Sequence, residues 1–308
     1  MKICFIDAGI FVEKPELLSP LEEVGTVQVF DGIPESLEEV VERAGDAEVI
    51  AFGLMQFTNE MLDSLPKLKV LQFIGTGVWN FVDVDYAESK GIKIVNIDGY
   101  GSNAVAEYAL AMAMVLSKKI TRADQVIKTQ QWTIDGLQGK EIAGSTVGVV
   151  GTGSIGKLVA EKFLALGAKV IACDLYENAE LKEKYGVQYK SIKELFMQSD
   201  IITLHMKVTK ENENIVDRKL LELAKKDALL INVARAELVN TEDLYKALLT
   251  GRIGGAAIDV YDSEPPKTKD YLLGELKNVI ATPHMAYYTQ EASDNSIKMA
   301  VSSILASL

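Results

Sequence analysis

A glycine-rich turn joins a stretch typical of a buried strand to a stretch with helical periodicity. Residues 146–150 are short, apolar and uncharged, as in a parallel strand that is covered on both faces. The turn reads Gly151-x-Gly153-x-x-Gly156, and apolar residues then recur at helical spacing through 155–166. The sequence therefore predicts a strand, a tight turn and a helix in succession.

Each glycine of this motif is needed for a different physical reason. Gly151 permits the sharp turn, Gly153 lets a diphosphate approach the backbone, and Gly156 lets the helix pack close to its strand. The free N–H groups and positive dipole end of the new helix favour an anion, so we expect Ser154 and Ile155 to contact the diphosphate of a dinucleotide.

A second apolar run, 169–173, ends at Asp174, which lies 18 residues after the last glycine. An acid at this place accepts hydrogen bonds from a ribose 2′-hydroxyl. It disfavours NADP, because a 2′-phosphate would meet a carboxylate and the following Leu175 and Tyr176 offer no compensating arginine. A Gly-x-Gly-x-x-Gly motif alone is weak, so the prediction of NAD depends on the strand, turn, helix and acid together.

Length and charge limit the classes of protein. A chain of 308 residues suits two domains. The net charge of −12, without a basic block, argues against nucleic acid or anionic membrane as a partner. The best candidate for a membrane span, 104–116, is too short and contains Glu107. The chain starts directly with a predicted strand, and we expect a soluble, cytoplasmic protein.

Cysteine and histidine are scarce. Cys4 and Cys173 fall in predicted strands, so we interpret them as core residues in a reducing compartment. No spacing of residues suggests a metal site. The only histidines are His205 and His284, which narrows the choice of an acid–base residue.

Strand and helix patterns alternate along the chain and predict an α/β fold. We expect two Rossmann-like or flavodoxin-like domains, each a doubly wound parallel sheet, with a cleft between them. One domain comprises 1–99 plus 286–308, and the other comprises 100–285. The 99–119 stretch predicts a helix that is apolar nearly all round, which we place at the domain junction or at a subunit interface. Trp132 is expected to pack in the link into the second domain.

Polar side chains follow three of the predicted strands. Arg235 follows one, Asp259 and Glu264 follow the next, and His284 follows the last. Ligands of open parallel sheets bind beyond the carboxyl ends of the strands, so these groups could meet at one edge. Each also has an ordinary alternative as a solvated arginine, a capping or loop acid, or a structural histidine.

Four segments in this order resemble the D-isomer-specific 2-hydroxyacid dehydrogenase family. They are GTGSIG with its spaced Asp174, LINVARAELVNTEDL at 230–244, AAIDVYDSEPP at 256–266 and ATPHMAYYT at 281–289. The ordered set is specific, whereas a single member would not be. The resemblance implies a cofactor domain inserted into a substrate domain that is built from both ends of the chain.

The resemblance implies catalytic roles for three residues. His284 would donate a proton to a ketone oxygen while NADH delivers hydride to the carbon, or would remove that proton in the reverse direction. Glu264 would bond the other imidazole nitrogen and fix the ring. Arg235 would hold the substrate carboxylate with its planar fork of donors and polarise the ketone.

The resemblance extends the cofactor site beyond the glycine turn. Asp259 matches the position that bonds the nicotinamide carboxamide. His205 would contact the adenosine side, although a core histidine is an equal alternative. The expected contacts after the later strands are His205, Val233, Ala234, Arg235, Asp259 and His284.

A second turn, Gly75-Thr76-Gly77, follows a predicted strand in the first domain. The family binds the substrate carboxylate there through backbone N–H groups, and the alternative is a plain strand-exit turn. Trp79 replaces the usual aspartate and the segment is about one residue longer, so Trp79 and Asn80 become candidates to line the pocket.

These observations predict an NAD-dependent oxidoreductase that interconverts a 2-oxo acid and a D-2-hydroxy acid, working as a homodimer. The alternatives are an NAD(H)-sensing binding protein on the same fold and a formate dehydrogenase, which Glu264 beside His284 disfavours. The absence of cations near Gly75 favours small or apolar substrates such as glyoxylate, hydroxypyruvate, pyruvate or branched analogues. The stop at Leu308, with no appended regulatory domain, weakens the expectation of a regulated biosynthetic phosphoglycerate dehydrogenase.

Overall fold

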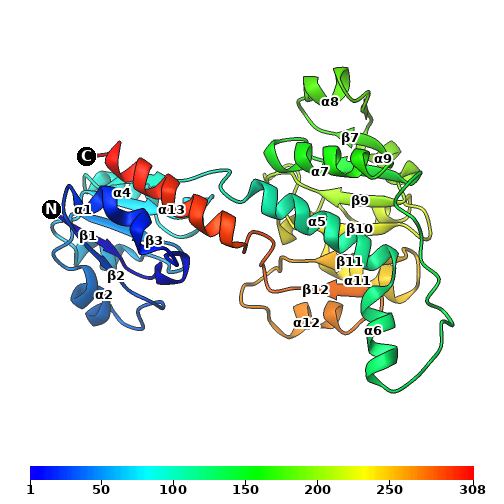
Figure 1. The fold of residues 1–308 in the computed structure, drawn as a ribbon, viewed down its shortest axis with the longest axis horizontal. Coiled ribbons are helices and arrows are strands. Elements are labelled where there is room, and N and C mark those ends of the chain that lie inside the picture. Colours follow the sequence, from blue (N-terminus) through cyan, green and yellow to red (C-terminus); the bar gives the residue numbers. More distant parts are fainter. The chain divides into compact units, whose positions relative to one another are not determined.

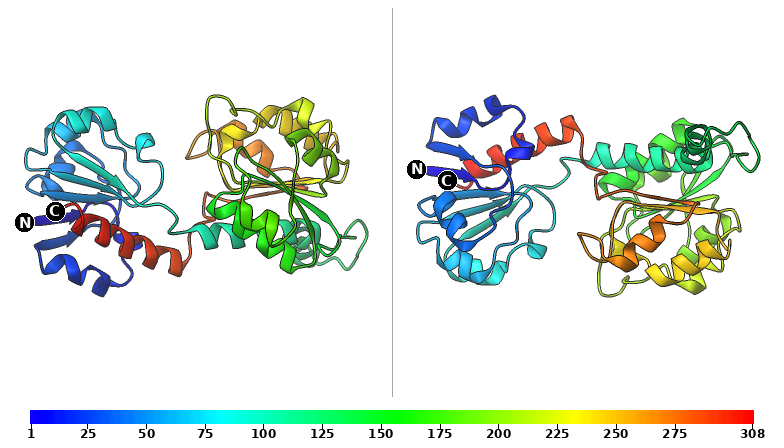
Figure 2. Two further views of the ribbon diagram at one scale, coloured as in Figure 1. Left: turned by 90° about the horizontal axis from the view of Figure 1, so that it is seen from above. Right: turned by 90° about the horizontal axis from the view of Figure 1, so that it is seen from below.

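The chain forms two compact units, each an open sheet with helices on both faces (Figures 1 and 2). This computed structural model describes residues 1–308 except the side chains of 268–270. Unit 1 comprises Met1–Gly101 and Tyr288–Leu308, and unit 2 comprises Ser102–Tyr287. Both boundaries lie two residues after those that we expect from the sequence.

Unit 1 is built on a five-stranded parallel sheet of order β2-β1-β3-β4-β5. Its strands are β1 (Lys2–Phe5), β2 (Thr26–Val29), β3 (Val49–Phe52), β4 (Val70–Phe73) and β5 (Lys93–Asn96). Its helices are α1 (Ser19–Glu22), α2 (Leu37–Ala44), α3 (Asn59–Asp63), α4 (Val84–Ser89) and α13 (Gln290–Leu305), with 3-10 turns η1 (Gly9–Phe11), η2 (Pro15–Leu18) and η3 (Val78–Asn80). The carboxyl-terminal helix α13 packs on β4 and β5. The sequence does not predict β2, because this edge strand is mostly exposed and lacks a buried apolar face.

Unit 2 is built on a seven-stranded parallel sheet of order β12-β11-β10-β9-β6-β7-β8. Its strands are β6 (Thr146–Val150), β7 (Lys169–Cys173), β8 (Gln188–Tyr189), β9 (Ile201–Leu204), β10 (Leu229–Asn232), β11 (Gly255–Ile258) and β12 (Val279–Ala281). Its helices are α5 (Ser102–Ser117), α6 (Ile120–Lys128), α7 (Ser154–Ala165), α8 (Ala179–Glu183), α9 (Ile192–Gln198), α10 (Arg218–Leu221), α11 (Thr241–Leu249) and α12 (Thr268–Gly274), with the 3-10 turn η4 (Ala236–Leu238). The doubly wound α/β class is thereby confirmed.

Two apolar layers cover the sheet of unit 2. On one face, α5 and α7 pack against the strands and against each other, and Phe163 is fully buried there. On the other face, α9, α10 and α11 contribute Leu195, Leu220 and Leu244. The apolar surface of α5 is thus largely explained by packing within its own unit, through small residues such as Ala109.

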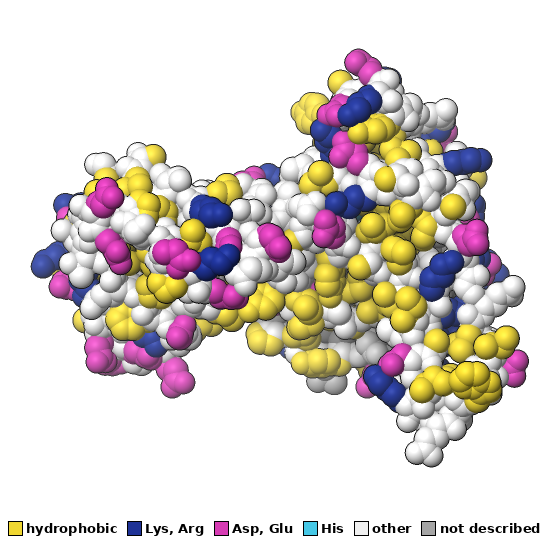
Figure 3. Space-filling view, viewed as in Figure 1, with side chains coloured by type: hydrophobic (Ala, Val, Ile, Leu, Met, Phe, Trp, Pro, Cys, Tyr) yellow, Lys and Arg dark blue, Asp and Glu magenta, His cyan; other side chains and the backbone are white. Residues whose placement is uncertain are grey.

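The segment after α5 carries exposed apolar side chains. No residue of α6 is buried, and Ile127 is 57% exposed. Trp132 and Ile134 are 94% and 86% exposed, and Figure 3 shows apolar side chains gathered over α6. The expectation that Trp132 packs in a link is wrong, because nothing within the described chain covers its ring.

None of the helices described here combines the length and the apolar character that crossing a membrane requires. Cys4 is buried and Cys173 is partly buried, and both thiols are free, as expected for core residues. The described side chains include no cluster of His, Cys, Asp or Glu that could hold a metal ion.

Candidate active site

Steric contacts require glycine in the turn between β6 and α7 and again in the first turn of α7. Gly151 has φ of +89°, and a Cβ there would lie 2.7 Å from the backbone of His205. A Cβ on Gly156 would lie 1.9 Å from the carbonyl oxygen of Gly151. The turn therefore packs against the exit of β9, the neighbour of β6, where the strand order of the sheet reverses.

The third glycine faces open space. A Cβ on Gly153 would meet no atom within 4 Å. Gly153 is also the N-cap of α7 and supplies no side-chain bond, so the helix begins without a side-chain cap. Free N–H groups beside open space fit the diphosphate of a dinucleotide.

Asp174 follows β7 and lies beside this turn. Its carboxylate accepts bonds from the backbone N–H of Thr152, from the Thr152 hydroxyl at 3.1 Å and from the N–H of Tyr176 at 3.1 Å. The hydroxyl of Tyr189 donates to Thr152 Oγ1 at 2.9 Å. The sequence motif distinguishes neither Thr152, a variable position of the turn, nor Tyr189, which belongs to the two-residue strand β8. Together these bonds hold the Asp174 carboxylate beside the turn, where it could accept hydrogen bonds from ribose hydroxyls.

His205 lies under the turn as a neutral group. Its Nε2 is 2.7 Å from the Thr203 hydroxyl, and burial lowers the pKa of the imidazole to about 3. An imidazole with this pKa does not exchange protons near neutral pH, so His205 does not suit an acid–base role.

The other polar groups follow three adjacent strands of the same sheet. The register aligns Asn232 of β10 with Ile258 of β11, and Ile258 with Ala281 of β12. Arg235, Glu264 and His284 follow β10, β11 and β12 within a few residues of these aligned positions. They therefore leave the sheet at one edge, as the carboxyl ends of parallel strands do.

A hydrogen bond joins the acid and the imidazole. His284 Nδ1 lies 2.6 Å from Glu264 Oε2, and both side chains are partly exposed, at 36% and 40%. Burial raises the pKa of the Glu264 carboxyl. The hydrogen bond and charge of His284, the backbone N–H of Tyr261 and the charge of Arg235 together lower that pKa by more. The bond orients the ring and leaves Nε2 as the nitrogen that can meet a ligand.

Arg235 is held by its own loop. The buried side chain of Asn232 donates to the Arg235 carbonyl at 2.9 Å and accepts the N–H of Ala234 at 3.1 Å. Arg235 Nη1 donates to the Ala234 carbonyl at 2.8 Å. Val233 is buried beneath this loop. Asn232 thus shapes the loop, a role that its position inside a predicted strand does not reveal.

Asp259 is fully buried just beyond β11. Its carboxylate accepts bonds from the Thr282 hydroxyl and from the backbone N–H groups of Met285 and Ala286, at 2.6–3.0 Å. The contact with a nicotinamide carboxamide stays a prediction.

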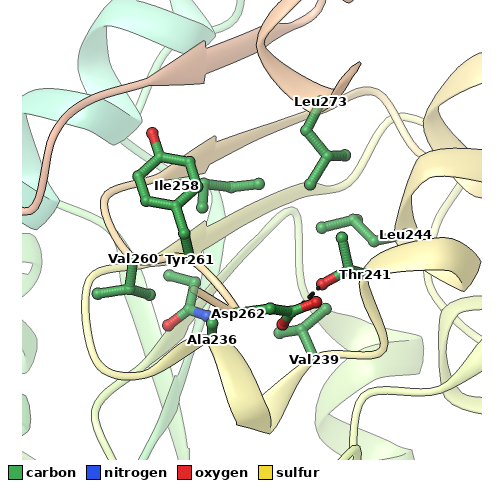
Figure 4. Close-up of a pocket in the computed structure, with 10 residues that line it drawn as sticks. Ala236, Val239, Thr241, Leu244, Ile258, Val260, Tyr261, Asp262 and Leu273 are labelled. Atoms are coloured by element: carbon green, nitrogen blue, oxygen red, sulfur yellow. Dashed lines mark hydrogen bonds between the residues drawn. The ribbon is translucent and has the colours of Figure 1, made fainter. Parts of the chain in front are cut away.

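A small cavity lies between the loops after β10 and β11 (Figure 4). Val239, Leu244, Ile258 and Leu273 give it an apolar lining, and the Thr241 hydroxyl bonds Asp262 across one side at 3.1 Å. Arg235, Glu264 and His284 do not line it, so the cavity belongs to the packing beneath the site.

The turn Gly75-Thr76-Gly77 follows β4 in unit 1. Gly77 has φ of +91°, which favours glycine, and the Thr76 hydroxyl lies 3.3 Å from Asp98 Oδ1. A Cβ on Gly77 would lie 3.7 Å from the ring of Trp79, which is 67% exposed. The indole therefore stands beside the turn rather than in the core.

A sequence model described as "D-isomer specific 2-hydroxyacid dehydrogenase, NAD binding domain" matches residues 110–286. The chain belongs to this family. The match falls within unit 2, so the NAD-binding domain carries the glycine turn, Asp174 and the Glu264–His284 pair. NAD fits the acid at the end of β7.

Relatives within the family have several names. The chain is 38% identical over 274 residues to a D-3-phosphoglycerate dehydrogenase of Methanocaldococcus jannaschii, covering 88% of this chain and 51% of that protein. It is 32% identical to a hydroxypyruvate reductase of Blautia hydrogenotrophica, covering 92% and 89%. The structure of an Aquifex aeolicus D-lactate dehydrogenase complexed with NAD and lactic acid has a TM-score of 0.83 at 30% identity, covering 99% and 95%. The chain spans about half the length of the phosphoglycerate dehydrogenases that it matches.

Proposed function

We propose that this protein is an NAD-dependent oxidoreductase that interconverts a 2-oxo acid and a D-2-hydroxy acid. The 2.6 Å bond between Glu264 and His284 carries the proposal, because it orients an imidazole at the edge of the sheet that Arg235 also reaches. NADH, when bound, supplies the hydride for the ketone carbon. Gly153, the start of α7 and Asp174 would hold it.

The side chains of the domain supply the remaining chemistry. His284 Nε2 gives a proton to the ketone oxygen during reduction, and the neutral ring takes it back during oxidation. Glu264 keeps the ring in place through its hydrogen bond to Nδ1. Arg235 binds the substrate carboxylate with two parallel N–H donors and polarises the ketone.

Two features favour a substrate without a phosphate group. The segment around Gly75–Gly77, residues 74–83, contains neither Lys nor Arg. Trp79 presents an exposed indole beside that turn, which suits an uncharged side chain. We therefore propose that Gly75, Thr76 and Gly77 bind a small or apolar 2-oxo acid, with hydroxypyruvate, glyoxylate and pyruvate as the leading candidates.

A panel of 2-oxo acids that includes 3-phosphohydroxypyruvate, assayed by NADH absorbance, tests this proposal. We expect reduction of at least one small 2-oxo acid, and loss of turnover in His284→Ala and Arg235→Ala with NADH binding retained. Normal turnover by the His284 variant would remove the acid–base assignment. An NAD(H) sensor is less favoured, because a sensor needs neither the oriented imidazole nor the arginine; NADH-dependent partner binding without any turnover would support it.

We also infer a homodimer. The segment 120–134 places Ile127, Trp132 and Ile134 in solvent, and large apolar side chains grouped in this way are typical of subunit interfaces. Light scattering should give the mass of two chains, and Trp132→Ser with Ile134→Ser should shift the protein toward the monomer. A monomeric parent protein would contradict the inference.

A further inference from the structure

His284 occupies a backbone conformation that a non-glycine residue rarely adopts. Its φ is +51°, in the left-handed region, and Pro283 precedes it. Such a conformation persists where the surroundings hold it, and it is common where a side chain must point in a set direction. The surroundings of the loop 282–286 therefore matter for the direction of the imidazole.

One buried carboxylate bonds this loop on both sides of His284. Before it, the Thr282 hydroxyl donates to Asp259 Oδ1 at 2.6 Å. After it, the N–H of Met285 donates to Oδ1 at 3.0 Å, and the N–H of Ala286 donates to Oδ2 at 2.8 Å. Asp259 has no exposed surface, so its carboxylate is committed to these donors.

The same segment also holds the ring. Asp259 and Glu264 both follow β11, and the hydroxyl of Tyr261 between them donates to the Thr282 carbonyl at 2.8 Å. The backbone of the loop and the Nδ1 atom of His284 are thus bonded to one stretch of six residues, 259–264. A shift of the loop relative to this stretch would break the alignment of His284 with Glu264.

We propose that Asp259 is a positioning residue whose carboxylate holds the loop 282–286 in the conformation that aims His284. The proposal rests on the proposed function for the role of the imidazole. It assigns to Asp259 an effect on proton transfer through the loop, independent of any contact with nicotinamide.

Three variants separate these roles. Asp259→Asn keeps the shape of the side chain but replaces one carboxylate oxygen, an acceptor, by an NH₂ group, a donor that would face the N–H and O–H donors of the loop. Thr282→Val removes one bond to the carboxylate and leaves Asp259 intact, and Thr282→Ser restores the hydroxyl as the matched control. Each full-length variant is measured for kcat and KM, for NADH affinity by fluorescence, and for amide hydrogen exchange at Met285 and Ala286.

We expect kcat to fall about a hundredfold in Asp259→Asn and about tenfold in Thr282→Val, because misplaced catalytic groups lose rate steeply. Thr282→Ser should stay near the parent value. The dissociation constant of NADH should stay within about twofold in both Thr282 variants, which leave Asp259 in place. The amides of Met285 and Ala286 should lose protection in Asp259→Asn.

Three results would overturn the inference: protected amides in Asp259→Asn, an unchanged kcat in both Thr282→Val and Asp259→Asn, or a loss of NADH affinity in Thr282→Val as large as its loss of kcat. The last result would show that the bond between Thr282 and Asp259 acts on the cofactor. A parent protein that reduces no 2-oxo acid, with the amides deprotected in Asp259→Asn, would refute the proposed function while supporting the bonds between Asp259 and the loop.

Discussion

Alanine substitutions at Gly153 and Gly156, three residues apart in one turn, should have different consequences. A Cβ on Gly156 would lie 1.9 Å from the carbonyl oxygen of Gly151 and 3.3 Å from the Cβ of His205. Since real contacts of this kind are not closer than 3.0 Å, the backbone must move by about 1 Å. A Cβ on Gly153 would meet nothing within 4 Å.

The change in the free energy of unfolding that we expect for Gly156→Ala is the sum of two opposing effects. Overpacking costs about 1–3 kcal/mol, and the contact is with backbone that cannot rotate away, so we take the upper end. Replacing a glycine inside a helix by alanine stabilises the fold by roughly 0.5–1 kcal/mol. A net loss of about 2 kcal/mol should lower the Tm of unit 2 by about 4–8 °C.

Gly153→Ala should leave the Tm within about 1 °C of the parent value, because its methyl group enters open space. The same methyl group would stand where we expect the diphosphate, so the dissociation constant of NADH should rise about tenfold or more, equivalent to roughly 1.4 kcal/mol. The loss of affinity would therefore occur without a loss of stability.

Calorimetry without cofactor and fluorescence titration with NADH measure the two effects, and each variant serves as the control for the other. Gly153→Ala with parent affinity for NADH would refute the cradle at the start of α7. Gly156→Ala with parent stability would refute the close packing of helix and turn.

Further predictions concern the site and the core. Glu264→Gln should lower kcat roughly tenfold to a hundredfold, since a hydrogen bond to a charged group is worth about 1.5–3 kcal/mol. Because the pKa of the Glu264 carboxyl is held below its ordinary value, the carboxylate that bonds His284 is present above that lowered pKa and is lost as the pH falls through it. A kcat profile should therefore show an acid limb in the parent that is absent from Glu264→Gln. Arg235→Lys should raise KM for the 2-oxo acid about tenfold in steady-state assays, because the charge remains but the fork is lost; an unchanged KM would contradict the carboxylate assignment. Phe163→Ala should destabilise unit 2 by about 3–5 kcal/mol in denaturant titrations, and Phe163→Leu by less than about 1.5 kcal/mol.

Much of the fold can be predicted where the signal is local. Buried parallel strands are continuous apolar runs, so β6 and β7 can be predicted from the sequence. β2 lies at an edge with mostly exposed side chains, so its sequence carries no comparable pattern. Trp132 is expected to be buried and is exposed instead. Hydrophobicity favours burial but does not indicate whether the same chain supplies the contact.

The amino-acid sequence is sufficient to predict the strand, glycine turn and helix at 146–166, since these depend on steric contacts between residues close in the chain. It also placed Arg235, Glu264 and His284 after three successive strands. The folded chain is needed to see that these strands are adjacent, that His284 has φ of +51° and that Asp259 is buried against its loop. Those features depend on bonds between segments more than 20 residues apart, whose partners spacing alone does not specify.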